Sequence, residues 1–336
     1  VNTRTLPTMS AVKNIEDDNW TKNYIWYDGK SRPVGTFSIN HLGGYTKTES
    51  ELDFAGVAKQ TRVYHKRLAS ETEKVISQTF EYDGRNRIKK VWHKVNNLPQ
   101  ELLSENSYNE LSQLSNKKTG NSLQSIDYSY NIKGSVTKVN DPAGLGTKLF
   151  GYELKYFNPQ NTTGSAGKYN GNIAEVTWKT ASDNVLRQYN YQYDALNRLK
   201  KGTYSEPESS VPRNDLYNES VTYDMNSNIL SLQRNTKGIS GTASQMDNLV
   251  YGYADNGRSN RLHSVTDSSA NYSGYPDASG NPISYDDNGN MTDHIDKGIL
   301  EIRYNVLNLP DYVKFDRTYV PRFTALEIEY HVNTSY

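Results

Sequence analysis

The sequence predicts an all-β fold that is built from successive antiparallel β-hairpins. Three observations support this prediction. A short Tyr-Asp phrase recurs along the chain, apolar and polar residues alternate around each copy, and convincing helical segments are scarce. The phrase is clearest in "YDALNRLKK" at residues 193–201 and in "YDGRNRIKK" at residues 82–90. Self-similarity of this kind is typical of repeat proteins, in which each repeat is one small structural unit.

Six copies of the phrase share one internal spacing. In each copy an Asp or Asn follows the tyrosine, and an apolar residue stands six positions after the tyrosine. In chain order the six sets are Tyr82, Asp83 and Ile88; Tyr108, Asn109 and Leu114; Tyr130, Asn131 and Val136; Tyr193, Asp194 and Leu199; Tyr223, Asp224 and Ile229; and Tyr285, Asp286 and Met291.

Further copies are less regular. The pairs Tyr27-Asp28 and Tyr304-Asn305 begin two of them. In "ELDFAGVAKQ" we expect Phe54 to take the place of the tyrosine. All of these residues are predicted to be structural anchors of the repeat, and none is predicted to be catalytic.

Each position in the phrase has a physical role. In "QYNYQYD" the side chains of Tyr189, Tyr191 and Tyr193 share one face of a strand, since side chains alternate with a period of two. The Asp or Asn that follows can bond backbone amides ahead of it and so begin a turn. A Gly or Asn four or five positions after the tyrosine tolerates a left-handed backbone. The apolar residue at the sixth position then begins the outgoing strand, which predicts a hairpin loop of about three to five residues.

The remaining segments set the predicted boundaries. Residues 1–23 are expected to be an N-terminal extension, residues 24–316 the β-repeat domain, and residues 317–336 a divergent strand or tail. Loops rich in Gly, Ser, Pro and Asn at 158–172, 205–219 and 268–284 are expected to be surface insertions. The segment 64–77 is the best candidate for a helix, but its hairpin spacing favours strands.

Composition excludes several classes of protein. Lys plus Arg equal Asp plus Glu at 38 each, so the chain as a whole is not an electrostatic nucleic-acid binder. Only 35% of residues are hydrophobic, but 27 tyrosines can supply large apolar rings with a polar hydroxyl. There is no cysteine, and no apolar run approaches the length of a membrane helix. Because the chain begins with Val1 rather than a methionine, it is expected to be a processed or excised piece of a longer polypeptide.

The sequence predicts no catalytic, cofactor or metal site. The six histidines lack zinc-binding spacing. In "YDDNGNMTD" the residues Asp286, Asn288, Asn290 and Asp293 partly match a calcium loop, but a hairpin turn explains them better. Two alternatives stay open, namely a hydrolase site in an insertion loop and a carbohydrate site on exposed tyrosines such as Tyr272 and Tyr275.

The units resemble the YD repeats of the RHS proteins. The copies "YDGRNRIKKV", "YDALNRLKK" and "YDDNGNMTD" carry the resemblance, and "YDGKSRPVGTFSINHLGG" resembles the stretch before RHS repeats in bacterial RHS proteins. The resemblance covers residues 24–316 and implies hairpins that coil into a curved, spiralling sheet, as part of a hollow shell.

The resemblance also implies a function. In bacteria such shells belong to secreted or cell-surface polymorphic toxins and enclose a toxin domain, so the implied partners are an enclosed toxin cargo and the rest of an RHS polypeptide, or another protein, at exposed strand edges. The alternative is a cell-surface adhesion or glycan-binding module. The Pro-x-x-Tyr-Asp-Pro-x-x-Gly-Arg-Phe-like core motif that stands beside the autoprotease site of RHS proteins is not found in this sequence, so neither self-cleavage nor toxin activity is implied.

Overall fold

The computed structural model describes residues 3, 5–14, 18–162, 165–269, 271, 273–276, 279–316 and 334–335. Within this part nearly all regular structure is β-strand, which confirms the all-β prediction. The helical elements described are α1 (Ala254–Gly257) and the 3-10 helix η1 (Ile295–Lys297). Asp255 and Asn256 of α1 have positive φ angles, so this element is a turn rather than a regular helix. No helix in the described residues is long and apolar enough to span a membrane.

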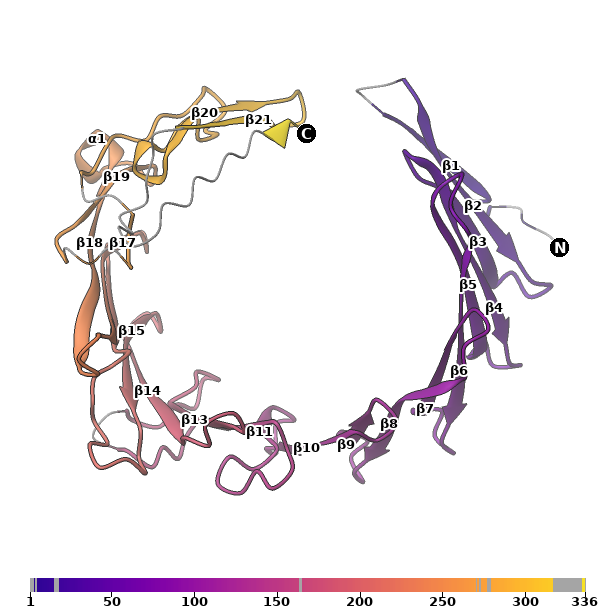
Figure 1. Cartoon of the computed structure of the whole chain (residues 1–336), viewed down its shortest axis with the longest axis horizontal. Coiled ribbons are helices and arrows are strands. Elements are labelled where there is room, and N and C mark those ends of the chain that lie inside the picture. The colour runs from indigo at the N-terminus through magenta and orange to yellow at the C-terminus, as the bar shows by residue number, and fades with distance from the viewer. Residues whose placement is uncertain are drawn as a thin grey trace. The chain divides into compact units, whose positions relative to one another are not determined.

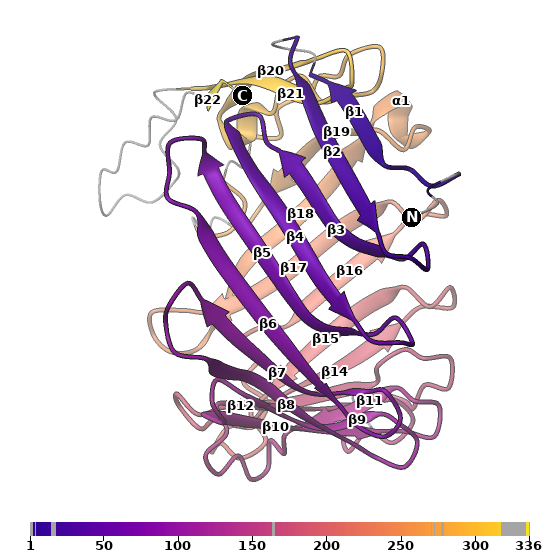
Figure 2. The ribbon, with the colours of Figure 1, turned by 90° about the vertical axis from the view of Figure 1, so that its right-hand side faces the viewer.

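The chain divides into two compact units, residues 1–140 with 146–148 and residues 141–145 with 149–336. The sequence did not predict this division. The strands of the first unit are β1 (Met9–Lys13), β2 (Trp20–Tyr27), β3 (Pro33–Ile39), β4 (Gly43–Leu52), β5 (Ala58–Leu68), β6 (Lys74–Tyr82), β7 (Ile88–Val95), β8 (Glu101–Tyr108), β9 (Leu114–Thr119), β10 (Gln124–Tyr130) and β11 (Val136–Val139). Each strand pairs antiparallel with the next, so chain order and sheet order coincide (Figure 2).

The second unit repeats this arrangement (Figure 1). Its main strands are β12 (Phe150–Lys155), β13 (Glu175–Thr180), β14 (Arg187–Tyr193), β15 (Leu199–Ser205), β16 (Glu219–Tyr223), β17 (Ile229–Lys237), β18 (Ala243–Tyr253) and β19 (Leu262–Asp267). They also pair in chain order. A small separate sheet contains β20 (Ile299–Tyr304), β21 (Pro310–Phe315) and β22 (Thr334–Ser335).

The predicted boundaries need one correction. Because β1 pairs with β2, the sheet begins before residue 24, inside the segment that was expected to be an extension. At the other end, β22 pairs with β21, while the rest of the predicted tail at 317–336 lies outside the described residues.

The segment 64–77 forms strands. It contains the end of β5 and the start of β6, which are joined by a turn and paired in register with Tyr64 opposite Val75. The β-branched residues Val63, Val75 and Ile76 suit a pleated surface, and sheet pairing therefore outweighs the weak helical pattern.

The hairpin tips share one irregularity. Glu81 pairs with Lys90, but the next residue, Tyr82, pairs with Ile88, so Lys89 is an extra residue in the outgoing strand. The same register shift stands immediately before Tyr27, Tyr108, Tyr130, Tyr193, Tyr223, Tyr253 and Tyr304. Such a bulge makes the tip twist and explains why the apolar residue follows at the sixth position.

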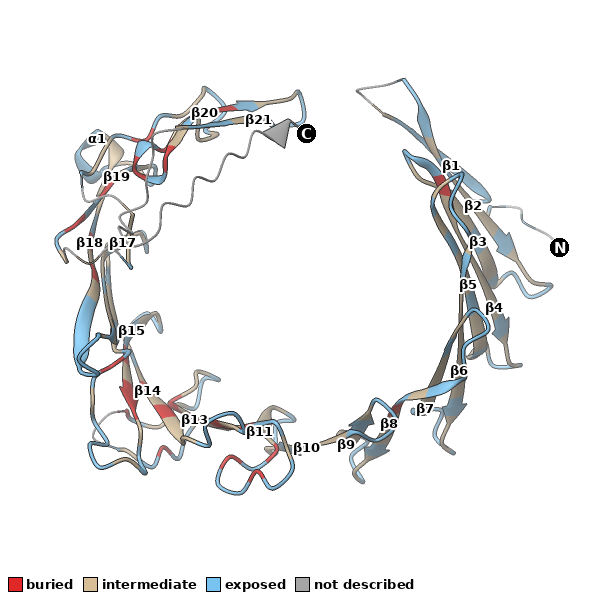
Figure 3. Ribbon diagram, viewed as in Figure 1, coloured by how far each residue is buried: buried red, intermediate tan, exposed pale blue. Residues whose placement is uncertain are grey.

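Burial differs between the two units (Figure 3). All buried apolar side chains of the described residues belong to the second unit; they are Leu145, Ala174, Tyr204, Leu216, Leu249, Val265, Ile283 and Ile302. The first unit is a sheet with mostly half-buried side chains, so cross-strand pairs and backbone hydrogen bonds stabilise it rather than an enclosed core.

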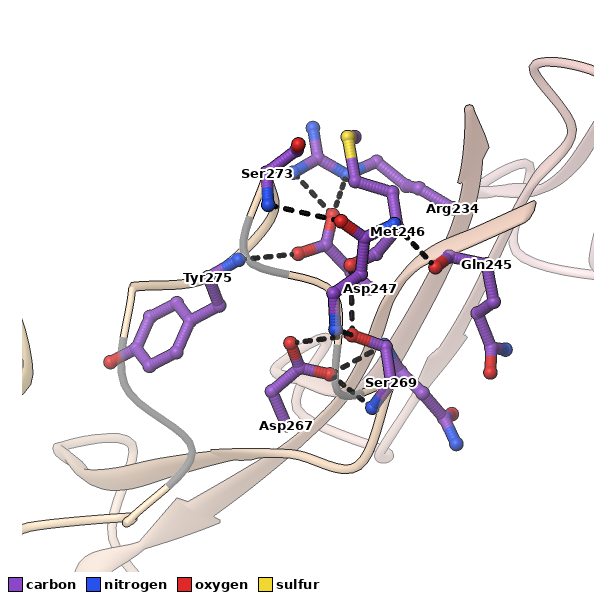
Figure 4. Close-up of polar contacts among 10 residues, drawn as sticks. Arg234, Gln245, Met246, Asp247, Asp267, Ser269, Ser273 and Tyr275 are labelled. Carbon is purple, nitrogen blue, oxygen red and sulfur yellow. Dashed lines mark hydrogen bonds and ion pairs between the residues drawn. The ribbon is translucent and has the colours of Figure 1, made fainter. Parts of the chain in front are cut away.

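In the second unit the insertion at 268–284 packs onto the sheet. Asp247 of β18 is completely buried, and its carboxylate accepts hydrogen bonds from the Arg234 side chain at 2.7 Å and the backbone N–H of Tyr275 at 2.8 Å (Figure 4). A Cβ atom on Gly274 would overlap the carbonyl oxygen of Met246 and the Asp247 carboxylate. This loop therefore needs glycine where its backbone meets β18.

We predict that Gly274→Ala destabilises the second unit by about 1–3 kcal/mol, because the added methyl group must push the loop away from β18. Gly144→Ala in the same unit is the matched control, since a Cβ there meets nothing within 4 Å. Urea unfolding followed by tyrosine and tryptophan fluorescence measures both. Equal stability of the two variants would contradict this packing.

Candidate functional site

The tyrosines at the hairpin tips connect neighbouring hairpins. Each hydroxyl donates a hydrogen bond to a backbone carbonyl of the preceding hairpin. The pairs, with O–O distances of 2.7–2.9 Å, are Tyr27 to Pro7, Tyr82 to Ala58, Tyr108 to Ile88, Tyr130 to Leu114, Tyr193 to Ile173, Tyr223 to Leu199, Tyr253 to Ile229, Tyr285 to Leu262 and Tyr304 to Met291. We call this set the tyrosine ladder.

The acceptor carbonyls occupy equivalent positions. Ile88, Leu114, Leu199, Ile229 and Met291 are the apolar residues that stand six positions after a tyrosine. The predicted anchors of one repeat are thus bonded to the predicted anchors of the next. Burial raises the pKa of Tyr82 and of Tyr193, which keeps these hydroxyls protonated as donors at neutral pH.

The Asp or Asn after each tyrosine organises the tip. Asp83 Oδ1 accepts the backbone N–H groups of Arg85 at 2.9 Å and Arg87 at 3.0 Å, while Asn86 takes a left-handed φ of 59°. The equivalent contact to the amide four residues on is made by Asp28, Asn109, Asn131, Asp194, Asp224, Asp286 and Asn305. Asn and Asp both occur because the turn requires only the Oδ1 acceptor.

Arginine adds a contact between neighbouring tips. Arg198 donates from Nε to Asp194 Oδ2 at 2.6 Å and from Nη1 to the carbonyl oxygen of Asp224 at 2.8 Å in the next tip. Its guanidinium also lies 4.6 Å from the ring centroid of Tyr223, whose hydroxyl bonds Leu199. The ion pair with Asp194 fixes Arg198 within its own tip, and the hydrogen bond to Asp224 and the cation–π contact with Tyr223 hold that tip to the next one.

The structure corrects one anchor. Leu52, not Phe54, stands at the tyrosine position, since Leu52 pairs with Ala58 after the register shift and Asp53 accepts the N–H of Val57 at 2.8 Å. Phe54 lies within the turn, 89% exposed, with Lys30 Nζ 3.5 Å from its ring centroid. The aromatic side chain suggested a tyrosine substitute, but the turn spacing from Asp53 decides the register.

One of the six regular copies, at residues 285–291, forms a turn without two full strands beside it. Tyr285 and Met291 form an isolated β-bridge rather than the ends of two strands. Its turn is nevertheless complete, with Asn290 N–H bonded to Asp286 Oδ1 at 2.8 Å and Gly289 at a φ of 85°.

The residues of the calcium alternative take part in backbone contacts. Asp286 caps its own turn, and Asp293 Oδ1 accepts the N–H of Ser284 at 3.0 Å. In the residues that the structure describes, no group of three or more His, Asp or Glu side chains is placed to hold a metal ion.

Of the two tyrosines that were candidates for carbohydrate binding, the structure describes one. Tyr272 lies outside the described residues. Tyr275 is packed beside the His294 ring, with its hydroxyl 3.3 Å from Asp296 Oδ2, so its ring is part of the folded loop.

The buried charged groups of the second unit, among them Asp247, Glu175 and Asp296, were not found from the sequence. Asp247 lies under the 268–284 loop, and Glu175 of β13 is bonded to Lys155 of β12. No sequence pattern predicted their contacts, because the partners are far apart in the chain and only the sheet register brings these side chains together.

Comparisons with known proteins support the fold alone. No family model matches the sequence, and no curated protein matches it. Among solved structures, TcdB2-TccC3 superposes with a TM-score of 0.56 at 13% identity over 92% of this chain and 17% of that chain. The structure TcdB2-TccC3-Cdc42 superposes with a TM-score of 0.52 at 12% identity over 92% of this chain and 18% of that chain. The chain shares the fold of the part of TcdB2-TccC3 on which it superposes.

This chain spans less than a fifth of the length of those solved chains. A Tc holotoxin pore from Photorhabdus luminescens also matches over 92% of this chain and 18% of that chain, at 12% identity, with a TM-score of only 0.36.

We predict that Tyr253→Phe lowers the free energy of unfolding by about 0.5–1.5 kcal/mol, because it removes the hydrogen bond to the Ile229 carbonyl and keeps the ring. Tyr251→Phe is the matched control. Tyr251 lies two residues earlier on the same face of β18, and no strand-crossing bond of its hydroxyl is described. Chemical denaturation of the two variants tests the ladder, and a larger loss for Tyr251→Phe would argue against it.

Acid should reduce the contribution of the Asp83–Arg87 ion pair to the stability of the fold. Hydrogen bonds from the side chain and backbone of Arg87 lower the pKa of Asp83 to about 2. A lowered pKa in the folded state stabilises the fold above the unfolded-state pKa of about 3.9, and this contribution is lost as the pH falls towards 2. We therefore expect a double-mutant cycle of Asp83→Asn and Arg87→Gln to show favourable coupling near pH 7 that is mostly lost by about pH 2.

The cycle is measured by urea unfolding at both pH values. The cycle subtracts the free-energy changes of the two single variants from that of the double variant. This removes the separate contribution of Arg87 stacking on Tyr108, whose ring centroid lies 4.4 Å from the guanidinium. Coupling that stays the same across this pH range would contradict the ion-pair contribution.

Proposed function

We propose that this chain is a non-catalytic wall segment of an RHS-type shell, which encloses or holds another polypeptide. The tyrosine ladder carries the proposal. The repeated residues at the tips bond one hairpin to the next, so the positions that define the repeat serve the continuity of a sheet. The fold shared with TcdB2-TccC3 supports the same role.

The edges of the sheets are where partners would bind. All five residues of β1 are exposed, and its described pairing is with β2 on one side. The free edge of such a strand presents backbone N–H and C=O groups that another chain can pair with. The rest of an RHS polypeptide is the proposed occupant of this edge. A toxin cargo and export from a bacterium are parts of the same proposal.

The buried charges of the second unit fit a structural role better than the hydrolase alternative. Glu175 and Asp247 have no exposed surface, and their carboxylates are bonded to neighbouring strands and loops. A hydrolase would present its reacting groups in an open cleft that admits substrate.

The carbohydrate-binding alternative has one observation in its favour. Phe157 and Tyr169 are 53% and 78% exposed, and their rings stack with centroids 6.2 Å apart. Flat exposed rings can stack on sugars. Glycan-array binding that is lost in Phe157→Ala and Tyr169→Ala would favour adhesion over the shell.

The shell proposal is tested by co-expressing this chain with the polypeptide encoded beside it and treating the complex with protease. We expect the partner to survive with this chain present and to be digested without it. The triple variant Tyr193→Phe, Tyr223→Phe, Tyr253→Phe should bind the partner but protect it less, because the ladder between successive hairpins is weakened. A partner that is digested equally in all three samples would overturn the proposal.

A further inference from the structure

Three polar side chains form a buried row across adjacent strands of the second unit. Lys155 at the end of β12 pairs with Glu175 of β13, and Glu175 pairs with Asn190 of β14. Their exposed fractions are 6%, 0% and 1%. The three side chains therefore stand side by side on one face of the sheet, out of contact with bulk water.

A single carboxylate connects the other two groups. Glu175 Oε1 accepts a hydrogen bond from Lys155 Nζ at 2.7 Å, and Glu175 Oε2 accepts one from Asn190 Nδ2 at 2.9 Å. Burying such an ion pair costs several kcal/mol of desolvation per ion, so stability alone is a weak reason for it. The arrangement places an amine and a carboxamide on the two oxygens of one proton acceptor.

The insertion loop adds donors to this row. The backbone N–H of Asn161 donates to Glu175 Oε2 at 3.0 Å, and Asn161 Nδ2 donates to Asn190 Oδ1 at 3.2 Å. A donor on Oδ1 polarises the carboxamide of Asn190 and stabilises negative charge that develops on that oxygen. The Cγ atom of Asn190 is thereby made a better electrophile.

We propose that Lys155 and Asn190 join through an intramolecular isopeptide bond between Lys155 Nζ and Asn190 Cγ. Glu175 takes one proton from the Lys155 ammonium, and the free amine attacks Cγ to give a tetrahedral intermediate whose oxyanion is bonded by Asn161. A second proton then passes from the attacking nitrogen, through Glu175, to the amide nitrogen of Asn190. The Cγ–Nδ2 bond breaks, ammonia leaves, and Glu175 ends protonated beside the new amide.

Enclosure favours this reaction. The three groups are fixed by sheet register, which replaces a bimolecular encounter with an intramolecular one of high effective concentration. Water is excluded, so hydrolysis of the carboxamide does not compete.

The first unit contains an exposed counterpart. Lys148 Nζ lies 3.0 Å from Asp127 Oδ2, and Asn116 Nδ2 lies 2.5 Å from Asp127 Oδ1. The side chain of Asp127 is 59% exposed, so water solvates its charge. This group of Lys, Asp and Asn lacks the enclosure of the buried row and should therefore stay unreacted, which makes it an internal control.

The bond would tie β12 to β14 across β13 and enclose the insertion loop at 158–172. It would hold three strands of the second unit together independently of their hydrogen bonds. This inference rests on the buried row and not on the proposed shell, and its mass-based test is separate from partner protection.

The test is mass spectrometry of the purified, folded chain. We expect the intact mass to fall short of the sequence mass by one ammonia. Trypsin should then release peptide 149–168, uncut after Lys155, joined to peptide 188–198. Peptides that contain Asn116 and Lys148 should be recovered unlinked.

Three variants assign the roles. Lys155→Arg and Asn190→Ala should show the full sequence mass, and Glu175→Gln should show it because a carboxamide cannot accept the ammonium proton. Near-ultraviolet circular dichroism of the stacked Trp178 and Tyr189 rings checks that each variant is folded. The mass of the unaltered chain decides the proposal even where a variant fails to fold.

Two results would overturn the proposal. One is a folded chain with the full sequence mass and with unlinked peptides 149–155 and 188–198. The other is an ammonia loss confined within peptide 149–168, which would place the loss at a side-chain amide of that peptide, such as Asn161, instead of Asn190.

Discussion

The hydrogen bond from a tip tyrosine to the carbonyl of the preceding hairpin is the contact on which the rest of the structure depends. A lone two-stranded hairpin is marginal in water because it buries little apolar surface. Tyr223 shows how the repeat compensates. Its ring lies against the guanidinium of Arg198, and its hydroxyl bonds Leu199, so one side chain attaches a new hairpin to the last. The spacing of the repeat follows, since the acceptor must begin the previous outgoing strand.

The tyrosine hydrogen bond occurs in both units, but the surroundings of the sheet differ between them. In the first unit, ladder tyrosines and short cross-strand pairs hold a sheet whose side chains are mostly half-buried. In the second unit, insertion loops cover parts of the sheet, and the groups beneath them include the buried charges Glu175 and Asp247. A charge under a loop must be paired, and Lys155 and Arg234 supply the partners. The loops thus create enclosed chemistry that the plain hairpins lack.

Because of this difference, carboxylates at the tips stabilise the sheet, whereas carboxylates under the loops are enclosed with groups that can react. At the tips, carboxylates such as Asp194 bond backbone amides and an arginine near water, which stabilises their charged form. Under the loops, the Glu175 carboxylate contacts an amine and a carboxamide without water. Similar residue types therefore cap turns in one place and are arranged for proton transfer in the other.

The sequence by itself determined the hairpin repeat, because turn and strand preferences are local. Tyr193, Asp194 and Leu199 lie within one short segment, and their spacing follows from the turn that joins them. Local reasoning was wrong at Phe54, where an aromatic residue in a turn resembled an anchor and Leu52 held the position.

Only the tertiary structure determined which residues of different strands and loops are neighbours. The bond from Tyr223 to Leu199 and the row of Lys155, Glu175 and Asn190 depend on strand register and on loops that fold back over the sheet. Register is a property of pairs of strands, and no single segment of sequence contains it. For the same reason the sequence predicted three insertions as surface loops, but could not show which buried charges they cover.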